Sequence, residues 1–286
     1  EITTRLVGSE MCIRDRLLLD ELPQGQQDAD NRLEMDITSV KNLQIGYHAE
    51  TIYLRRSPDD RFIVEEYIGG LSGSEYYAKV TANRIKTTIR YGRREEVNRS
   101  TYVNVYLPES WHGELQLSSQ YGDIISDEDW SFDRFAAETM EGSIALKSIT
   151  APRIRMSCPV GSIRFDRAEG FVDLHSVSGS IIAGAIAGGA KLETSGGPIT
   201  AAFTALNNIV ECNTLNGPVD LVLPKNTGIN MDGISKTGTI TSEIDGLTVQ
   251  TKPGNKQCIT GIIGEKPFQN VRISTINGNV HLREGE

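Results

Sequence analysis

The sequence predicts an all-β protein, a β-helix or β-solenoid with turns of about 20 residues, preceded by an antiparallel β cap. Glycines recur at nearly constant intervals, each with Ser, Thr or Cys three residues before it and Ile or Val two residues after it. Apolar residues stand seven and five residues before most of these glycines, as Leu115 and Leu117 do before Gly122. That period of two is typical of strands. From residue 110 onward no segment shows the longer apolar period of an amphipathic helix.

The array has eight members, and each member contributes one glycine and one branched aliphatic residue. The glycines are Gly122, Gly142, Gly161, Gly179, Gly197, Gly217, Gly238 and Gly278. The residues at plus two are Ile124, Ile144, Ile163, Ile181, Ile199, Val219, Ile240 and Val280. Successive glycines are 18 to 21 residues apart, except for a last interval of 40 that equals two periods and is partly filled by Gly261.

Each repeat is expected to be a strand of about five residues, a corner at the glycine, a second short strand and a loop of about eight residues. Such a unit cannot enclose a core by itself, so the units must stack. We expect the corner to require a glycine because sharp corners often need positive φ. The hydroxyl residue at minus three is expected to hydrogen-bond the backbone of its own corner or of the neighbouring turn.

The sequence on either side of the array and the array itself divide the chain into four segments. Residues 1–16 contain SEMCIRDR, which resembles a translated sequencing adapter, so we interpret them as a non-native or disordered leader. Residues 17–32 read as a polar linker, residues 33–110 as the antiparallel cap, and residues 111–283 as the repeats. Cap and repeats together form one continuous domain over 33–283.

Charge and composition narrow the classes of partner. The net charge of −9 disfavours binding to nucleic acid, which depends on clustered Lys and Arg. The four cysteines form no C-x-x-C pair, and the four histidines show no ligand spacing, so no metal or cofactor is expected. No apolar run is long enough for a membrane helix, so membrane attachment is expected only through an anchor upstream of the given sequence.

Catalysis on a β-helix would need carboxylates from adjacent turns that converge on a groove. At the outward positions that follow the glycines, only Asp123 is acidic. The acidic run Asp127 to Asp129 beside Trp130 could bind a cation or a sugar, and we expect a solvated loop there. The sequence therefore predicts no catalytic residues and no enzyme activity.

The S/T-x-x-G-x-I/V array, the Tyr106-Leu107-Pro108 entry and the closing segment ISTINGNVHL at Ile273–Leu282 together carry a family resemblance. The chain resembles the bacterial putative-adhesin family of β-strand-repeat domains of unknown function, the LiaG-like and head-GIN-like proteins, over roughly residues 33–283. The resemblance implies a non-enzymatic domain that is extracytoplasmic or at the cell surface, with a cytoplasmic location left open. It supplies no binding residues.

Three functions follow as hypotheses. The first is an adhesin-like interaction module that presents a repetitive Ser/Thr/Asn-rich face to a protein or glycan. The second is a structural scaffold that self-assembles through its ends or an exposed strand edge. The third is a carbohydrate-active β-helix enzyme, which would require two or more carboxylates in one groove.

Overall fold

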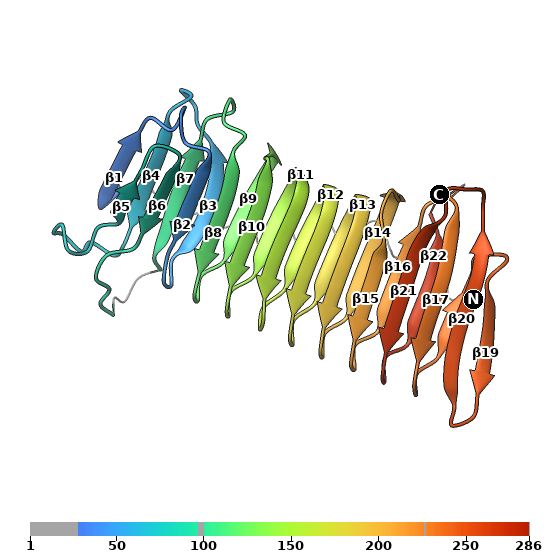
Figure 1. The fold of residues 1–286 in the computed structure, drawn as a ribbon. Helices are drawn as coiled ribbons and strands as arrows, with labels where there is room; N and C mark the ends of the chain where they lie inside the picture. Colours follow the sequence, from blue (N-terminus) through green and yellow to red (C-terminus); the bar gives the residue numbers. More distant parts are fainter. Residues whose placement is uncertain (1–27, 97–99, 226, 286) are drawn as a thin grey trace, which may run out of the picture.

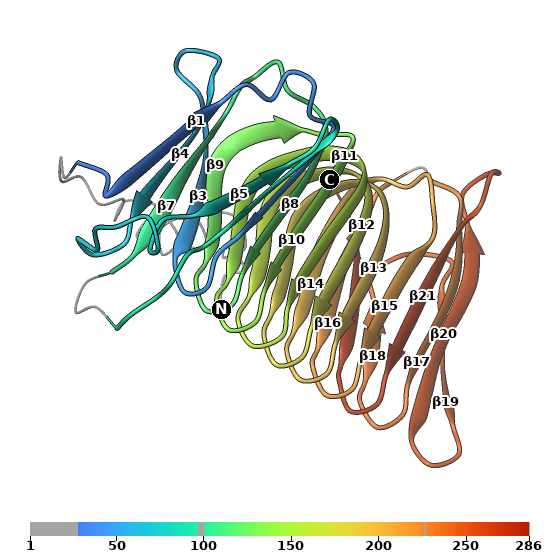
Figure 2. The ribbon, with the colours of Figure 1, turned by 60° about the vertical axis from the view of Figure 1, so that its left-hand side comes forward.

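The computed structural model describes residues 28–96, 100–225 and 227–285. All regular elements in these ranges are β-strands, and the strands form a long rod that widens at the cap (Figures 1 and 2). The all-β solenoid is therefore confirmed. The leader expected over 1–16 and most of the linker over 17–32 lie outside the described residues, although Asn31 and Arg32 already belong to the first strand.

Seven strands precede the first strand of the repeats. They are β1 (Asn31–Met35), β2 (Asn42–Gly46), β3 (Thr51–Arg56), β4 (Phe62–Tyr67), β5 (Lys79–Ala82), β6 (Lys86–Arg90) and β7 (Tyr102–Leu107). The repeats contribute β8 (Glu114–Ser119), β9 (Ile124–Ser131), β10 (Arg134–Thr139), β11 (Ile144–Cys158), β12 (Ile163–Ser176), β13 (Ile181–Thr194), β14 (Ile199–Ala205), β15 (Val210–Thr214) and β16 (Val219–Leu223). The C-terminal part contains β17 (Ile229–Ser235), β18 (Ile240–Ser242), β19 (Thr248–Lys252), β20 (Lys256–Ile263), β21 (Gln269–Thr275) and β22 (Val280–Glu284).

The cap contains the expected antiparallel pairs, β1 with β4, β4 with β7, and β5 with β6. It also contains parallel strands, which the sequence did not predict. Strand β2 pairs in parallel with β8, and β3 pairs in parallel with β9. Ile52 thereby stands beside Ile124, so β2 and β3 form a turn of the solenoid before the first glycine of the array.

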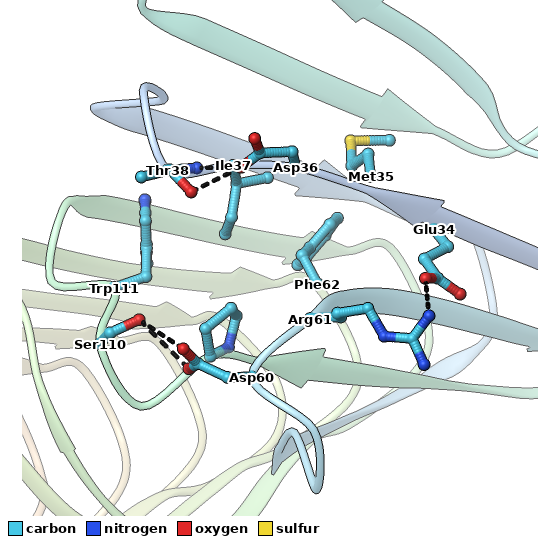
Figure 3. Close-up of a pocket in the computed structure, with 11 residues that line it drawn as sticks. Glu34, Met35, Asp36, Ile37, Thr38, Asp60, Arg61, Phe62, Ser110 and Trp111 are labelled. Carbon is cyan, nitrogen blue, oxygen red and sulfur yellow. Dashed lines mark hydrogen bonds and ion pairs between the residues drawn. The ribbon is translucent and has the colours of Figure 1, made fainter.

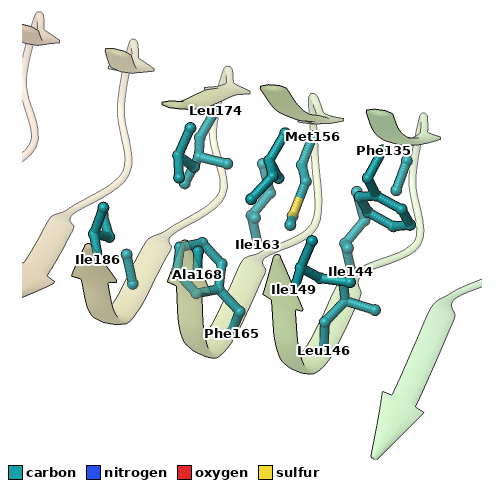
Figure 4. Close-up of a cluster of buried hydrophobic side chains, with 14 of the residues drawn as sticks. Phe135, Ile144, Leu146, Ile149, Met156, Ile163, Phe165, Ala168, Leu174 and Ile186 are labelled. Carbon is teal, nitrogen blue, oxygen red and sulfur yellow. The ribbon is translucent and has the colours of Figure 1, made fainter. Parts of the chain in front are cut away.

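The turns differ in one respect from the expected repeat. Strands β11, β12 and β13 run for 15, 14 and 14 residues, so continuous strand replaces the eight-residue loop expected in these turns. Each long strand bends around the core and sends Ile149, Ala168 or Ile186 inward. Figure 4 shows these residues facing side chains such as Met156 and Leu174 from the other side of the turn.

The eight residues at plus two are all buried, with exposed fractions of 5% or less. They stack in parallel register, as Ile163 does beside Ile144 and Ile181. Burying a side chain of this size contributes about 1.5–3 kcal/mol. The column of branched aliphatic side chains is therefore a principal part of the core.

The eight corner glycines form a second column, for a reason other than the one expected. None of them has a positive φ; the positive φ values belong to glycines elsewhere, such as Gly170 and Gly188. The Cα of each corner glycine instead faces the carbonyl oxygen of the corresponding residue in the adjacent turn, so closely that a Cβ would be less than 3.0 Å away. The absence of a side chain allows the turns to stack at the corner.

The hydroxyl residues at minus three connect this column. Their oxygens accept a hydrogen bond from the corner glycine N–H, as Thr139 does from Gly142 (3.1 Å). Thr139 Oγ1 also donates to the carbonyl of Gly122 in the neighbouring turn (3.0 Å). Cys158 substitutes for a hydroxyl residue, and its thiol donates to the Gly142 carbonyl (2.8 Å).

The order of the turns changes at the C-terminal end of the rod. Strand β21 lies between β15 and β17, and β22 lies between β16 and β18, so the last two strands fill a gap left by earlier ones. The interval of 40 residues arises because β19 and β20 form a hairpin on β17 before the chain returns. Gly261, expected to fill a missing corner, instead lies within β20 opposite Met231.

An alternation of charge accompanies this order. Along one outward row the parallel strands place Lys191, Glu211, Arg272 and Asp232 side by side in that order. If β17 paired directly with β15, Glu211 would stand beside Asp232. Like charges directly opposite each other destabilise a sheet, and opposite charges stabilise it. The inserted strand therefore separates two carboxylates with an arginine.

Candidate functional site

A groove of about 280 Å³ lies on the outward face of the solenoid, across β9, β11, β12 and β13. One line of its wall is formed by the residues that directly follow three corner glycines, namely Asp123, Ser143 and Ser162. The next outward positions along the same strands provide Ile125, Ala145, Arg164 and Ile182. The groove thus combines a polar row with a largely apolar row, each running along the axis of the rod.

Hydrogen bonds hold the polar row in place. The Ser143 N–H donates to Asp123 Oδ1 (2.7 Å), and the Ser162 N–H donates to Ser143 Oγ (3.2 Å). The Ser162 hydroxyl donates to Ser143 Oγ over 3.4 Å. These contacts connect three successive turns, so the groove wall is fixed by the stacking of the solenoid.

Tyrosines extend this surface into the cap. Tyr53 on β3, Tyr67 on β4, and Tyr102 and Tyr106 on β7 alternate with core residues such as Ile52 and Val103 and lie half-buried on the outward side. The rings of Tyr67 and Tyr102 stack at 4.3 Å between centroids, and Tyr53 meets Tyr102 edge-on at 5.9 Å. Tyr53 stands beside Ile125 in the parallel register of β3 and β9, so the tyrosines and the groove are contiguous.

We call this combined surface the tyrosine–serine face. It comprises Tyr53, Tyr67, Tyr102, Tyr106, Asp123, Ile125, Ser143, Ala145, Ser162 and Ile182. Burial raises the pKa of all four tyrosines, and the pKa of Tyr67 reaches about 12. The face therefore presents neutral phenols at physiological pH.

Three carboxylates border the groove, whereas the sequence placed only Asp123 on the outward row and expected Asp127 in a solvated loop. Asp123 belongs to the polar row, and Asp127 and Asp166 line the groove further along β9 and β12. Asp127 and Asp166 are exposed to solvent. A catalytic carboxylic acid is typically held in an apolar pocket that keeps it protonated. The groove contains several carboxylates, as a β-helix enzyme would require. Asp127 and Asp166, however, do not lie in such an apolar pocket.

The acidic run at Asp127–Asp129 is not a loop. It lies within β9, at a bulge where the register with β11 shifts between Leu146 and Ser148. Glu128 pairs with Arg56 (3.3 Å), and Asp129 pairs with Lys147 (3.3 Å). Two of the three carboxylates of the run are therefore engaged in cross-strand ion pairs.

The histidines are dispersed over the molecule. His48 packs against Tyr121 at 5.1 Å, His112 contacts the Ser131 carbonyl, His175 lies near Glu193, and His281 contacts Glu243. Within residues 28–96, 100–225 and 227–285, no three His, Cys, Asp or Glu side chains are arranged to hold a metal ion.

A second cavity, of about 540 Å³, lies in the cap between the end of β1 and the turns at 57–61 and 108–111 (Figure 3). Its charged groups have partners within the cap. Glu34 pairs with Arg61, Asp60 accepts from the Ser110 hydroxyl (3.1 Å), and Asp36 accepts from the Thr38 N–H (2.8 Å). Hydrogen bonds from Thr38 lower the pKa of Asp36. The polar residues that line this cavity thus hold the turns of the cap in place. The tyrosine–serine face is therefore the stronger candidate site.

The sequence missed the four tyrosines as a group because they come from three strands that are separated along the chain. The alternation in Tyr102-Val103-Asn104-Val105-Tyr106 was the available signal, since it places both tyrosines on the side opposite the core. Their adjacency to the groove depends on the parallel pairing of β3 with β9.

A family model described as Toastrack DUF4097 matches residues 40–283. Two solved structures are similar: a putative cell adhesion protein from Clostridium sporogenes ATCC 15579 (11% identity, TM-score 0.28, covering 89% of this chain and 98% of that one) and a putative adhesin from Bacteroides fragilis NCTC 9343 (14% identity, TM-score 0.44, covering 90% and 100%). No curated protein matches the sequence. No helix in the described part of the chain is long and apolar enough to cross a membrane.

Proposed function

This chain belongs to the Toastrack DUF4097 family, and on that premise we propose that it is a non-enzymatic, adhesin-like interaction module at the bacterial cell surface or envelope. The observation that supports this proposal is the tyrosine–serine face, where half-buried tyrosines adjoin a groove of about 280 Å³. Tyrosine is enriched in binding surfaces because it offers a rigid apolar ring together with a polar hydroxyl.

The construction of the face favours binding over catalysis. Its polar groups are fixed by hydrogen bonds between turns, as Ser143 is by Asp123 and Ser162. Asp127 and Asp166 are exposed to solvent, whereas a catalytic carboxylic acid is typically enclosed in an apolar pocket. A rigid surface of this kind binds a partner with little loss of conformational entropy.

The test is binding to isolated envelope fragments of the source bacterium, measured by biolayer interferometry with the full chain immobilised. Ala145→Gln should fill the groove from an outward position and reduce retention of the fragments, while the melting temperature stays unchanged. Gln116→Ala, on the opposite outward side of the solenoid at β8, is the matched control and should bind like wild type. Equal retention by Ala145→Gln and wild type would rule out this face as the interaction surface.

Self-assembly is the second candidate, and one observation favours it. Strand β19 pairs only with β20 among the described strands, all five of its residues are exposed, and the Val249 side chain is 39% exposed. An unpaired edge of this kind can add a strand from another chain. Concentration-dependent growth in light scattering that disappears in Val249→Lys would support assembly, and a monomer at all concentrations would exclude it.

A further inference from the structure

We infer that the tyrosine–serine face binds a neutral glycan chain laid along the axis of the solenoid, because it places a row of hydroxyl and carboxylate groups beside an apolar and aromatic row with the same spacing. This inference rests on the proposed function and specifies its ligand. The partner class follows from three properties of the face, which are its periodicity, its chemistry and its position within the sheet.

The periodicity is set by strand pairing. Thr51, Asp123, Ser143 and Ser162 occupy the same position in four successive turns. Neighbouring strands are about 4.8 Å apart, and this spacing is comparable to the length of one sugar unit in an extended pyranose chain. One polar group of the face is therefore available for each sugar of a chain that follows the axis.

The chemistry of the two rows matches the two sides of a pyranose. The polar row offers the Ser143 and Ser162 hydroxyls and the Asp123 carboxylate, which can exchange hydrogen bonds with sugar hydroxyls. The adjacent row offers the Tyr53 ring and the Ile125, Ala145 and Ile182 side chains, with Arg164 between Ala145 and Ile182. These apolar groups suit the C–H surface of a sugar ring, which also stacks on aromatic faces.

Charge favours a neutral chain over an anionic polymer. Asp123, Asp127 and Asp166 border the groove, and Glu65 accepts from the Tyr67 hydroxyl (3.3 Å). They outnumber the cationic side chains of the face, which are Lys147, Arg164 and Arg55, the last of these over the Tyr53 ring at 5.5 Å. Lys147 is already paired with Asp129 (3.3 Å). The whole chain has a net charge of −9. This excess of negative charge would repel a polyanionic glycan.

Position within the sheet disfavours a polypeptide. Strands β9, β11, β12 and β13 are interior strands, each paired on both sides. Their backbone groups are therefore unavailable for strand addition, a common mode of peptide binding. Recognition has to occur through side chains, which suits a ligand that has its own hydroxyl groups.

The experiment titrates the full chain with two uncharged probes, cellohexaose and the fully N-acetylated chitohexaose, by isothermal calorimetry. We expect at least one of them to bind with a dissociation constant below about 1 mM. Tyr53→Ala should weaken binding about tenfold, the equivalent of one lost ring contact, and Tyr53→Phe should retain most of it. Ala145→Gln, which obstructs the groove without removing a packed side chain, should abolish binding. Tyr121→Ala removes an exposed tyrosine at a corner, off this face, and should leave the affinity unchanged.

Several results would overturn the inference. If neither hexasaccharide binds wild type while wild type still retains envelope fragments and Ala145→Gln does not, the glycan assignment fails and the interaction module remains. Saturable binding of a peptide at this face, without hexasaccharide binding, would also overturn the glycan assignment. If Ala145→Gln retains envelope fragments as wild type does, the proposed function itself fails. Chromatography should recover the hexasaccharides intact, and shorter products would show that the face catalyses hydrolysis.

Discussion

The most direct test of the stacking argument compares two adjacent glycines. Gly197 belongs to the corner column, and a Cβ added there would lie 2.5 Å from the carbonyl carbon of Gly179 in the neighbouring turn. Gly196 precedes it, and a Cβ added there would lie 3.7 Å from the Val177 carbonyl oxygen, an ordinary contact. Neither glycine has a positive φ, so backbone strain does not distinguish the two positions.

The cost of Gly197→Ala can be worked out from the contacts around it. The Cβ would lie 1.9 Å from the Gly179 carbonyl oxygen, so the two turns would have to separate by roughly 1.5 Å before ordinary contact at about 3.4 Å is restored. Two inter-turn hydrogen bonds, Ile181 N–H to the Pro198 carbonyl (3.0 Å) and Gly196 N–H to the Val177 carbonyl (2.8 Å), would then lie beyond bonding distance. Each contributes about 1 kcal/mol, and overpacking costs about 1–3 kcal/mol more. We expect a loss of about 3 kcal/mol or more in the free energy of unfolding.

The assay is urea denaturation followed by circular dichroism, with both variants measured beside wild type. Gly196→Ala should match wild type or gain up to about 1 kcal/mol, because alanine restricts the unfolded chain. If Gly197→Ala is as stable as Gly196→Ala, the close approach at the corner does not constrain this column, and the reasoning is refuted.

Four further outcomes test the core, the strand order, the tyrosines and the corner thiol. Ile181→Asp buries a charge at a fully buried position and should abolish cooperative unfolding, whereas Ser180→Ala next to it should leave stability unchanged in the same urea assay. Removing residues 269–286 deletes four buried aliphatic side chains from β21 and β22, worth about 6–12 kcal/mol; hydrogen exchange should show β15 and β17 unprotected, and retained protection would contradict the inserted strand order. Because burial raises the pKa of Tyr67 to about 12, the unfolded state should ionise first, near pH 10. The free energy of unfolding should therefore be level below about pH 9 and fall from about pH 10 to 12, with a smaller fall in Tyr67→Phe. Cys158→Thr keeps a donor to the Gly142 carbonyl and should stay within about 0.5 kcal/mol of wild type, while Cys158→Val should lose about 1 kcal/mol, both by urea denaturation.

The candidate site could be predicted only in part. The residues after the corner glycines were recognisable as an outward row, because strand side chains alternate between core and solvent. Asp127 and Asp166 were not recognised as neighbours of this row, because a loop was expected after the second short strand of each repeat. Strands β9 and β12 instead continue through these residues, so the alternation carries both carboxylates onto the outward side.

The sequence by itself determined the repeating unit. A glycine, a hydroxyl residue and a branched aliphatic residue at fixed offsets specify a corner, its hydrogen bond and the core column, because these are local relations within some twenty residues. Even there, the reason for the glycine came from the structure: it is the close approach of the next turn, and the backbone conformation of the corner does not require it.

Only the tertiary structure decided which turn lies beside which. Parallel stacking of similar turns leaves their order nearly degenerate in sequence, so neither the insertion of β21 between β15 and β17 nor the pairing of β3 with β9 could be derived. Long-range features resolve that degeneracy, such as the alternation of Glu211, Arg272 and Asp232 and the hairpin that covers β17. The tyrosine–serine face depends on the pairing of β3 with β9, so it can be recognised in the structure but could not be derived from the sequence.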